Sequence, residues 1–315
     1  MREHDVCLNL LLGWLADQHG RRFTIGERQE PDPNVLAADA TDGSFRLAVE
    51  VHPILDAIEN QAWLAHRQRL QDEMTAELTG AYALWLPPGA DLPSGANETQ
   101  SLLRLTREAA LRLEPGQRAY VPLPISIFIK KQQEEGGLMS VSGGLNHHWA
   151  RLTERVKGTY DLDSTRLHRL PESEEHLDQL FELIWERAAG LDTVGQWVEL
   201  ETIDAWTIQR LHGDGGMTIV GRPKDELGDI GLSVRRNFRR LLADAGPRLR
   251  SRKADIKALV VLGNYGRMEE EGATTAMRGY DPSLYAGLDF VCLAADGLIK
   301  PLMEATAGAL PWTRA

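Results

Sequence analysis

Apolar residues recur along the start of the chain in patterns that predict a helix, three strands, a second helix and a fourth strand. Residues 5–18 place apolar side chains over a broad helical face, and residues 45–51 alternate apolar with polar or small side chains, as in a strand. Asp42-Gly43 is typical of the hairpin turn before that strand. The remaining expected elements are strands at 22–27, 35–38 and 81–86 and a helix at 56–79. This order predicts that helix 56–79 is the crossover between two strands of one sheet.

The rest of the chain alternates expected helices and strands, which is typical of an α/β protein. Pro122 and Pro124 interrupt the apolar run 119–130 and favour an edge strand there. The runs 257–262 and 289–294 are continuously apolar, and we expect both to extend the sheet of the N-terminal part. Residues 300–315 are expected to form a loose tail. Further helices are expected at 98–113, 147–157, 173–189 and 232–243, and short strands at 197–200 and 217–220.

Composition indicates a folded protein and limits its partners. The 315 residues are 43% hydrophobic and 26% charged, which is close to globular averages. The net charge of −11 means that a polyanionic partner would need a local basic patch. Cys7 and Cys292 are far apart in apolar runs, which favours buried free thiols in a reducing compartment. No run approaches the roughly 20 apolar residues of a membrane span, and the N-terminus lacks a signal-peptide pattern. We therefore expect a soluble cytoplasmic protein with no membrane partner.

Two acidic residues near the expected hairpin are the most suggestive chemical feature of the chain. Asp32 stands close to the first strand of the hairpin and Glu50 lies on the second, so we expect the two carboxylates to meet. Neighbouring carboxylates repel, and each raises the pKa of the other unless a cation neutralises them. A hard divalent cation does so, and it also polarises a phosphate and lowers the pKa of a bound water. Alternatively, Asp32 is only a turn residue beside prolines, and Glu50 faces solvent on a half-exposed strand.

Pro31-Asp32 and Glu50-Val51-His52, in the order helix, hairpin, helix, strand, resemble the PD-(D/E)xK nuclease superfamily, the restriction-endonuclease-like proteins. The resemblance implies an α/β fold with a central mixed sheet flanked by helices and a large elaboration. It also implies Mg²⁺ or Mn²⁺ held by Asp32 and Glu50, and hydrolysis of phosphodiester bonds. On this interpretation, residues 1–135 form the nuclease-like core, 136–230 an elaboration of helices and strands, and 231–315 a basic helix and two strands that complete the sheet.

His52 departs from the family pattern, which has a lysine at this position. A lysine would stabilise charge on the attacking water or on the phosphate. A neutral histidine can instead act as a base or a metal ligand, so we expect Asp32, Glu50 and His52 to form the catalytic set. Members of the family sometimes move the basic residue to the next helix. Arg67 and Arg69 are candidates there, and Gln61 is a candidate polar site residue.

A dense basic run lies at residues 235–257, where nine basic side chains and two acidic ones give a local charge of +7. Four of the arginines have the spacing of a shared helix face: Arg235, Arg236, Arg239 and Arg240. Contact with a phosphate backbone is the functional interpretation of such a stripe. The alternative is a solvated helix face that pairs with acidic residues elsewhere in the chain.

These observations favour a Mg²⁺-dependent nuclease, a hydrolase that cleaves nucleic acid and acts on DNA rather than RNA. The missing lysine and the acidic balance favour a first alternative, a catalytically inactive nuclease-like protein with a binding or regulatory role. A second alternative is an α/β module that binds a small molecule or a protein through the loop Gly263-Asn264-Tyr265-Gly266. Each of these functions is compatible with a homo-oligomer.

Overall fold

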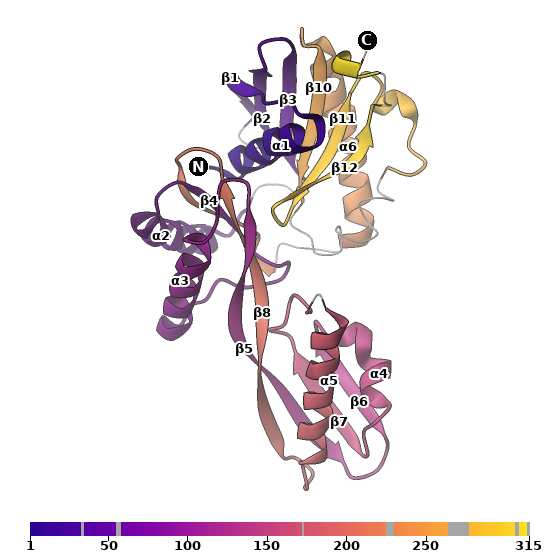
Figure 1. Ribbon diagram of the computed structural model, residues 1–315. Helices are drawn as coiled ribbons and strands as arrows, with labels where there is room; N and C mark the ends of the chain where they lie inside the picture. The colour runs from indigo at the N-terminus through magenta and orange to yellow at the C-terminus, as the bar shows by residue number, and fades with distance from the viewer. Residues whose placement is uncertain are drawn as a thin grey trace. The chain divides into compact units, whose positions relative to one another are not determined.

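The computed structural model describes residues 1–32, 35–54, 58–171, 173–224, 230–263, 277–305 and 309–313. In these residues the chain forms two six-stranded mixed sheets and six α-helices (Figure 1), which confirms the expected α/β class. The chain divides into two compact units that are not consecutive segments. Unit 2 comprises Pro93–Thr106 and Tyr120–Trp206, and unit 1 comprises Met1–Leu92, Arg107–Ala119 and Thr207–Ala315.

The first sheet belongs to unit 1 and has the strand order β1-β2-β3-β10-β11-β12. Its strands are β1 (Thr24–Asp32), β2 (Val35–Thr41), β3 (Arg46–Pro53), β10 (Ile256–Leu262), β11 (Phe290–Ala295) and β12 (Leu298–Glu304). The first three form an antiparallel meander, whereas β10 pairs parallel to both β3 and β11. The expectation that 257–262 and 289–294 extend the N-terminal sheet is therefore confirmed. The expected loose tail is wrong in part, because β12 pairs antiparallel to β11.

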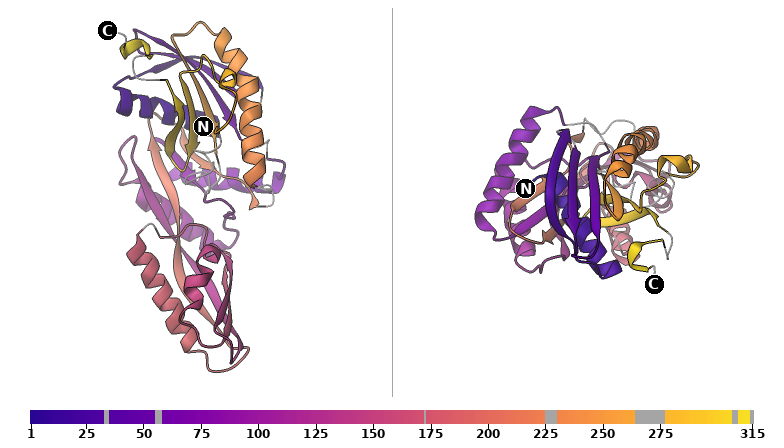
Figure 2. Two further views of the ribbon diagram at one scale, coloured as in Figure 1. Left: turned by 90° about the vertical axis from the view of Figure 1, so that its right-hand side faces the viewer. Right: turned by 90° about the horizontal axis from the view of Figure 1, so that it is seen from above.

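Two helices cover opposite faces of this sheet, α1 (Glu3–His19) and α6 (Ile230–Ser251). Leu8, Leu11 and Leu15 of α1 join one core cluster with Val49 of β3, and this cluster includes the buried Cys7. Figure 2 shows α6, in orange, running along the sheet. Its apolar side chains pack with Ala48 of β3 and with residues of β10 and β11 in a second cluster. Every second residue of β3 therefore faces α6.

The expected crossover through helix 56–79 is wrong. That segment contains α2 (Gln61–Glu77), but the strand that follows, β4 (Ala81–Trp85), belongs to the second sheet. β4 pairs with β8 (Trp197–Leu211) and β9 (Gly216–Val220). The helix that directly precedes the parallel partner of β3 is α6. The short sequence distance from strand 45–51 to strand 81–86 favoured pairing, but the apolar pattern of a strand does not encode its partner.

The second sheet has the order β6-β7-β5-β8-β4-β9, and two of its strands, β5 and β8, contribute to both units. Unit 2 contains β6 (Leu138–Gly143), β7 (Thr159–Ser164), most of β5 (Arg118–Gln133) and the first part of β8. The helices α5 (Glu174–Ala189) and α4 (Trp149–Thr153) lie beside these strands (Figure 1). Unit 2 has its own core, in which Phe181 and Ile184 of α5 pack on Ile127 and Ile129 of β5. The remaining helix, α3 (Ala96–Ala110), begins in unit 2 and ends in unit 1.

The prolines of β5 lie where the strand has one neighbour. Within the described residues, β5 pairs with β7 from Phe128 onward, so Pro122 and Pro124 precede that pairing. β5 is an interior strand of the whole sheet. Because β7, in the described chain, does not pair with the segment that contains the prolines, their missing N–H groups remove no hydrogen bond to β7. In the described part of the chain, no helix combines the length and apolar character needed to cross a membrane.

Candidate functional site

Glu50 and His52 lie on β3 in the interior of the first sheet, between β2 and β10. Because side chains alternate along a strand, both share the face of Ala48 and Ile54, which is the face that α6 covers. Glu50 is 3% exposed and His52 is 4% exposed. The interpretation of Glu50 as a solvent-facing strand residue is therefore wrong. A buried carboxylate needs a partner, and the structure supplies two.

Arg248 of α6 and His52 both contact the carboxylate of Glu50. The Arg248 Nη2 donates to Glu50 Oε2 at 2.8 Å and its Nε donates to Oε1 at 3.1 Å, which is the two-pronged geometry of strong arginine–carboxylate pairs. His52 Nε2 lies 2.9 Å from Glu50 Oε2 and 3.4 Å from Arg248 Nη2. Arg248 is 45% exposed at its side chain. It therefore links a buried acid to the surface.

These contacts keep Glu50 ionised despite its burial. Loss of solvent around the carboxylate acts to raise its pKa, but the hydrogen bonds from His52 and Arg248 and the positive charge of Arg248 outweigh that effect. The pKa of Glu50 therefore lies below its ordinary value of 4.5. At neutral pH the site holds a carboxylate anion whose charge a guanidinium balances.

Asp32, the expected partner of Glu50, ends β1 and pairs with Val35 of β2. β2 lies between β1 and β3, so one strand separates the backbone of Asp32 from that of Glu50. The side chains of Pro31 and Asp32 lie outside the described residues. The meeting of the two carboxylates therefore stays a prediction.

The auxiliary residues expected on helix 56–79 lie on α2, which is not the helix that covers β3. Arg67 of α2 donates to Glu3 of α1 at 2.7 Å and lies over the ring of Trp63, 5.1 Å from its centroid. Gln61 is exposed at the first residue of α2. Since α6 and not α2 covers β3, the basic residue that reaches Glu50 is Arg248.

The four arginines expected to contact phosphates are all exposed on α6. Arg235 donates to the backbone oxygen of Arg278 at 2.6 Å and lies 5.5 Å from the centroid of the Tyr280 ring. Arg236, Arg239 and Arg240 lie on the same helix as Arg248, and Asp244 separates them from it. The basic stripe and the arginine that reaches the buried acid are therefore two parts of one helix.

Sequence reasoning missed a second pair of charges beside Glu50. Asp39 of β2 pairs with Ala48 of β3, and Ala37 pairs with Glu50, so Asp39 is a diagonal neighbour of Glu50 on the same face. Arg252 Nη2 lies 2.8 Å from Asp39 Oδ2. Arg252 directly follows the last residue of α6, four residues after Arg248. The sequence does not show that this segment lies beside Glu50, because it does not show which helix covers β3.

The site has atoms of the types that bind divalent cations, but too few of them in the described residues to hold one. A carboxylate oxygen and an imidazole nitrogen, from Glu50 and His52, are acceptable ligands. Among the residues that the structure describes, no three His, Cys, Asp or Glu side chains gather as a metal site would need. Both oxygens of Glu50 also accept hydrogen bonds from Arg248. A metal at Glu50 therefore requires a third ligand and the release of Arg248.

The loop proposed as a ligand site after strand 257–262 lies, from Asn264 to Gly266, outside the described residues. Comparisons of this chain with protein-family models, with curated proteins and with solved structures gave no match. Its function therefore has to be inferred from its own residues.

Proposed function

We propose that this protein is a divalent-metal-dependent phosphodiester hydrolase that acts on nucleic acid, with Glu50 at its centre. The observation that carries the proposal is a buried Glu50-Val51-His52 segment on an interior strand. Around it the chain runs helix, three-stranded meander, helix, parallel strand, as α1, β1 to β3, α6 and β10. This is the order that the resemblance to PD-(D/E)xK nucleases implies, with residues 54–229 inserted between β3 and α6.

Each residue has a distinct role in this proposal. Glu50 and Asp32 hold the cation, and His52 serves as its third ligand or as a general base at its Nε2 atom. A bound Mg²⁺ or Mn²⁺ would supply polarisation of the phosphate and a more acidic water. Arg248 leaves Glu50 and contacts a phosphate of the substrate, to which a guanidinium binds in the same two-pronged way. The exposed arginines of α6 hold the neighbouring phosphates.

One observation favours a second candidate, a nucleic-acid-binding protein without catalysis. Arg248 takes both oxygens of Glu50, so its guanidinium already provides the positive charge that a metal would provide. In that case the core keeps its fold, the buried acid is a structural ion pair, and only the basic stripe of α6 contacts the ligand.

A cleavage assay tests the proposal. The purified protein is incubated with Mg²⁺ or Mn²⁺ and with duplex DNA, single-stranded DNA or RNA, and product formation is followed on denaturing gels. Glu50→Gln and Asp32→Asn remove the two acids without large changes in volume, and Glu27→Gln on β1 is the control because Glu27 is exposed. We expect cleavage, with DNA preferred, that a chelator and both site variants abolish and Glu27→Gln keeps.

Metal titration of wild type and Arg248→Met separates the two candidates. If Arg248 competes with the cation, Arg248→Met binds Mn²⁺ at least as tightly as wild type while cleaving more slowly. If the ion pair is permanent, wild type binds no Mn²⁺ and cleaves no substrate, although nucleic acid still binds. That second result would replace the hydrolase with the binding protein.

A further inference from the structure

Unit 2 contains a strand edge that its own sheet leaves open. β8 has β5 on one side, and within the described residues its pairing with β4 on the other side covers Thr207–Leu211. The preceding stretch from Trp197 to Trp206 belongs to unit 2, so in the described chain its outer backbone groups face no strand. Open edges invite pairing with another extended segment, and proteins usually protect them.

A groove of about 780 Å³ with a largely apolar lining borders this stretch of β8. Its lining comes from β5, β8, the first half of α5 and the segment that precedes α5, and it includes Tyr120, Leu180, Leu183 and Ile203. The segment before α5 is held in place by Asp204 of β8, a buried carboxylate. Asp204 Oδ1 accepts from the backbone nitrogens of residues 168 and 169, each at 2.9 Å. The groove is therefore preformed.

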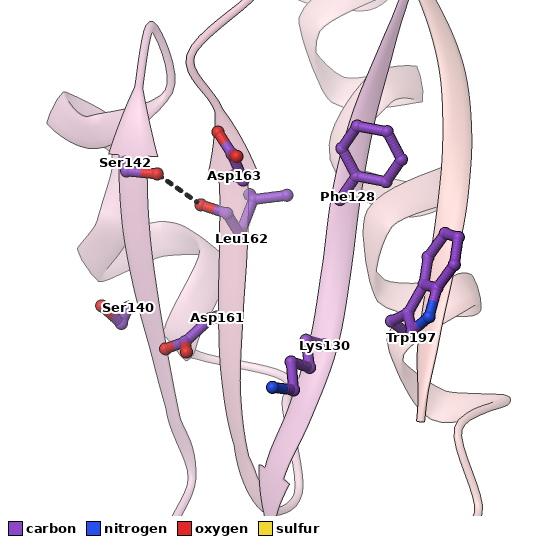
Figure 3. Close-up of a pocket in the computed structure, with 8 residues that line it drawn as sticks. All are labelled: Phe128, Lys130, Ser140, Ser142, Asp161, Leu162, Asp163 and Trp197. Atoms are coloured by element: carbon purple, nitrogen blue, oxygen red, sulfur yellow. Dashed lines mark hydrogen bonds between the residues drawn. The ribbon is translucent and has the colours of Figure 1, made fainter. Parts of the chain in front are cut away.

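Large apolar side chains are exposed along β8, where a protected edge would carry polar ones. Ile203 is 53% exposed and Trp197 is 60% exposed. Figure 3 shows Trp197 and Phe128 side by side on the open face of the sheet, with ring centroids 5.8 Å apart. Ile203 lines the groove, whereas Trp197 and Phe128 line a second hollow at the start of β8. Exposed apolar residues of this kind are typical of interaction surfaces.

The charge around the groove selects the kind of partner. Unit 2 has sixteen acidic and nine basic residues, a net charge of −7. The open stretch of β8 carries Glu199 and Glu201, and an acidic strip on α5 meets the groove at Gln179 and Leu183. The groove lining also includes His176 and Arg169, whose guanidinium lies over the ring of Tyr120, 5.6 Å from its centroid. The acidic residues of that strip are Glu174, Glu175, Asp178, Glu182 and Glu186, of which Asp178 and Glu182 pair with arginines of unit 2. A second copy of this edge would bring its own glutamates, and nucleic acid would bring phosphates. Both are repelled, whereas a cationic segment is attracted.

We propose that unit 2 binds an extended protein segment in which apolar residues alternate with lysine or arginine. The segment adds to the sheet as a strand along Trp197–Trp206 of β8. Its apolar side chains enter the groove between β8 and α5, and its cationic side chains face the glutamates of β8 and the acidic strip of α5. Main-chain pairing gives affinity in this binding mode, and the pockets for alternate side chains give specificity.

Binding of a synthetic peptide to the full chain tests this inference. The probe is a fluorescent peptide of alternating valine and lysine, about eight residues long, as for a usual strand, and binding is followed by anisotropy. A matched peptide of valine and glutamate tests the charge. A version of the lysine peptide with alternate backbone nitrogens methylated keeps its side chains but blocks strand pairing. Hydrogen exchange of residues 201–205 reports pairing directly.

Two variants distinguish the groove from other apolar surface. Ile203→Asp changes the exposed centre of the edge, and Trp149→Ala on α4 is the control because Trp149 is similarly exposed, at 51%, and lies outside the groove. We expect Ile203→Asp to weaken lysine-peptide binding by about tenfold or more, as for an anchor residue, and Trp149→Ala to leave it unchanged. Amides 201–205 should gain protection when the peptide binds.

Three results would overturn the inference. The first is equal binding of the methylated or glutamate peptide, and the second is equal binding by Ile203→Asp. The third is a pair of observations: the lysine peptide does not bind at millimolar concentration, and amides 201–205 gain protection when the protein concentration alone is raised. That result would mean that a second copy of the chain pairs with the edge. None of these readouts uses nucleic acid or metal, so they are independent of the proposed hydrolase.

Discussion

Asp42 closes the turn between β2 and β3 with its side chain. Its Oδ1 accepts from the backbone nitrogens of Ser44 at 2.9 Å and Phe45 at 2.8 Å, and Gly43 adopts a φ of 87°, which favours glycine. Burial acts to raise the pKa of Asp42, but these hydrogen bonds and Arg21 more than offset burial and hold it below the ordinary 3.8. The hairpin that carries Glu50 is therefore fixed by an ionised side chain.

We expect Asp42→Asn to lower the free energy of unfolding at neutral pH by on the order of 1 kcal/mol, the net contribution of a typical intramolecular hydrogen bond. A carboxyl with a depressed folded pKa contributes stability above its unfolded pKa and loses it as pH falls through the folded value. The difference between wild type and Asp42→Asn should thus be complete above pH 3.8 and vanish in stronger acid. Urea unfolding across this range measures it, and a difference that persists at low pH would assign the effect to geometry.

The residues of the site were partly predictable from the sequence. Glu50 and His52 follow from their place in an apolar strand, and both lie together on β3. Arg248 does not follow, because it is 198 residues from Glu50 in the chain and only the packing of α6 on β3 joins them. The position of Asp39 could not be predicted from the sequence for a related reason. Its position beside Glu50 depends on the register between β2 and β3, which the local pattern does not give.

At the scale of elements, periodicity located the long helices and the buried strands, since each hides an apolar face. It failed for β6 and β7, which were not predicted. In β7 only Tyr160 and Leu162 alternate with aspartates, which is too short a pattern to separate from a loop. It also failed for pairing, because β3 and β10 are joined by an insertion that contains a whole sheet. Strand pairing is a tertiary property that the sequence of a strand does not carry.

α6 has two roles in this protein, and its exposed side can be tested separately from its core side. Phe238 and Leu242 are buried on the side of α6 that packs against the sheet. Changes to the exposed arginines therefore leave this packing intact. If these arginines bind phosphates, Arg236→Gln combined with Arg240→Gln should weaken duplex DNA binding. The slope of log affinity against log salt should also fall by about 0.9 for each phosphate that the variant no longer neutralises. Titrations at several salt concentrations measure the slope.

The matched control for α6 is Arg187→Gln, since Arg187 is exposed on α5 of unit 2. It removes one positive charge without touching α6, whereas the α6 variant removes two, so the two slopes are compared per charge removed. An equal fall in the slope for Arg187→Gln would mean that the effect follows overall charge, and the basic stripe would lose its assignment as a nucleic-acid surface.

At the scale of the whole molecule, the insertion between β3 and α6 gives the chain a second hydrophobic core. Unit 1 keeps the buried acid beneath α6, while unit 2 has a separate core around Phe181. The chain passes between the units four times, at 92/93, 106/107, 119/120 and 206/207. A candidate catalytic site and a candidate peptide groove therefore rest on different hydrophobic cores, although β5 and β8 belong to both.

Because the two units have separate cores, we expect a core mutation in one unit to destabilise that unit and leave the other folded. Phe181 is fully buried in unit 2 and Leu11 in unit 1. Replacement with alanine should cost about 3–5 kcal/mol for Phe181 and about 2–5 kcal/mol for Leu11, each in its own unit. Because proteins open in cooperative parts, we expect Phe181→Ala to speed amide hydrogen exchange in β7 and α5 while β3 and β10 keep their protection. Leu11→Ala should do the reverse. If Phe181→Ala accelerates exchange in β3 as much as in β7, the chain unfolds as one cooperative structure, and a ligand bound at either site would stabilise the other.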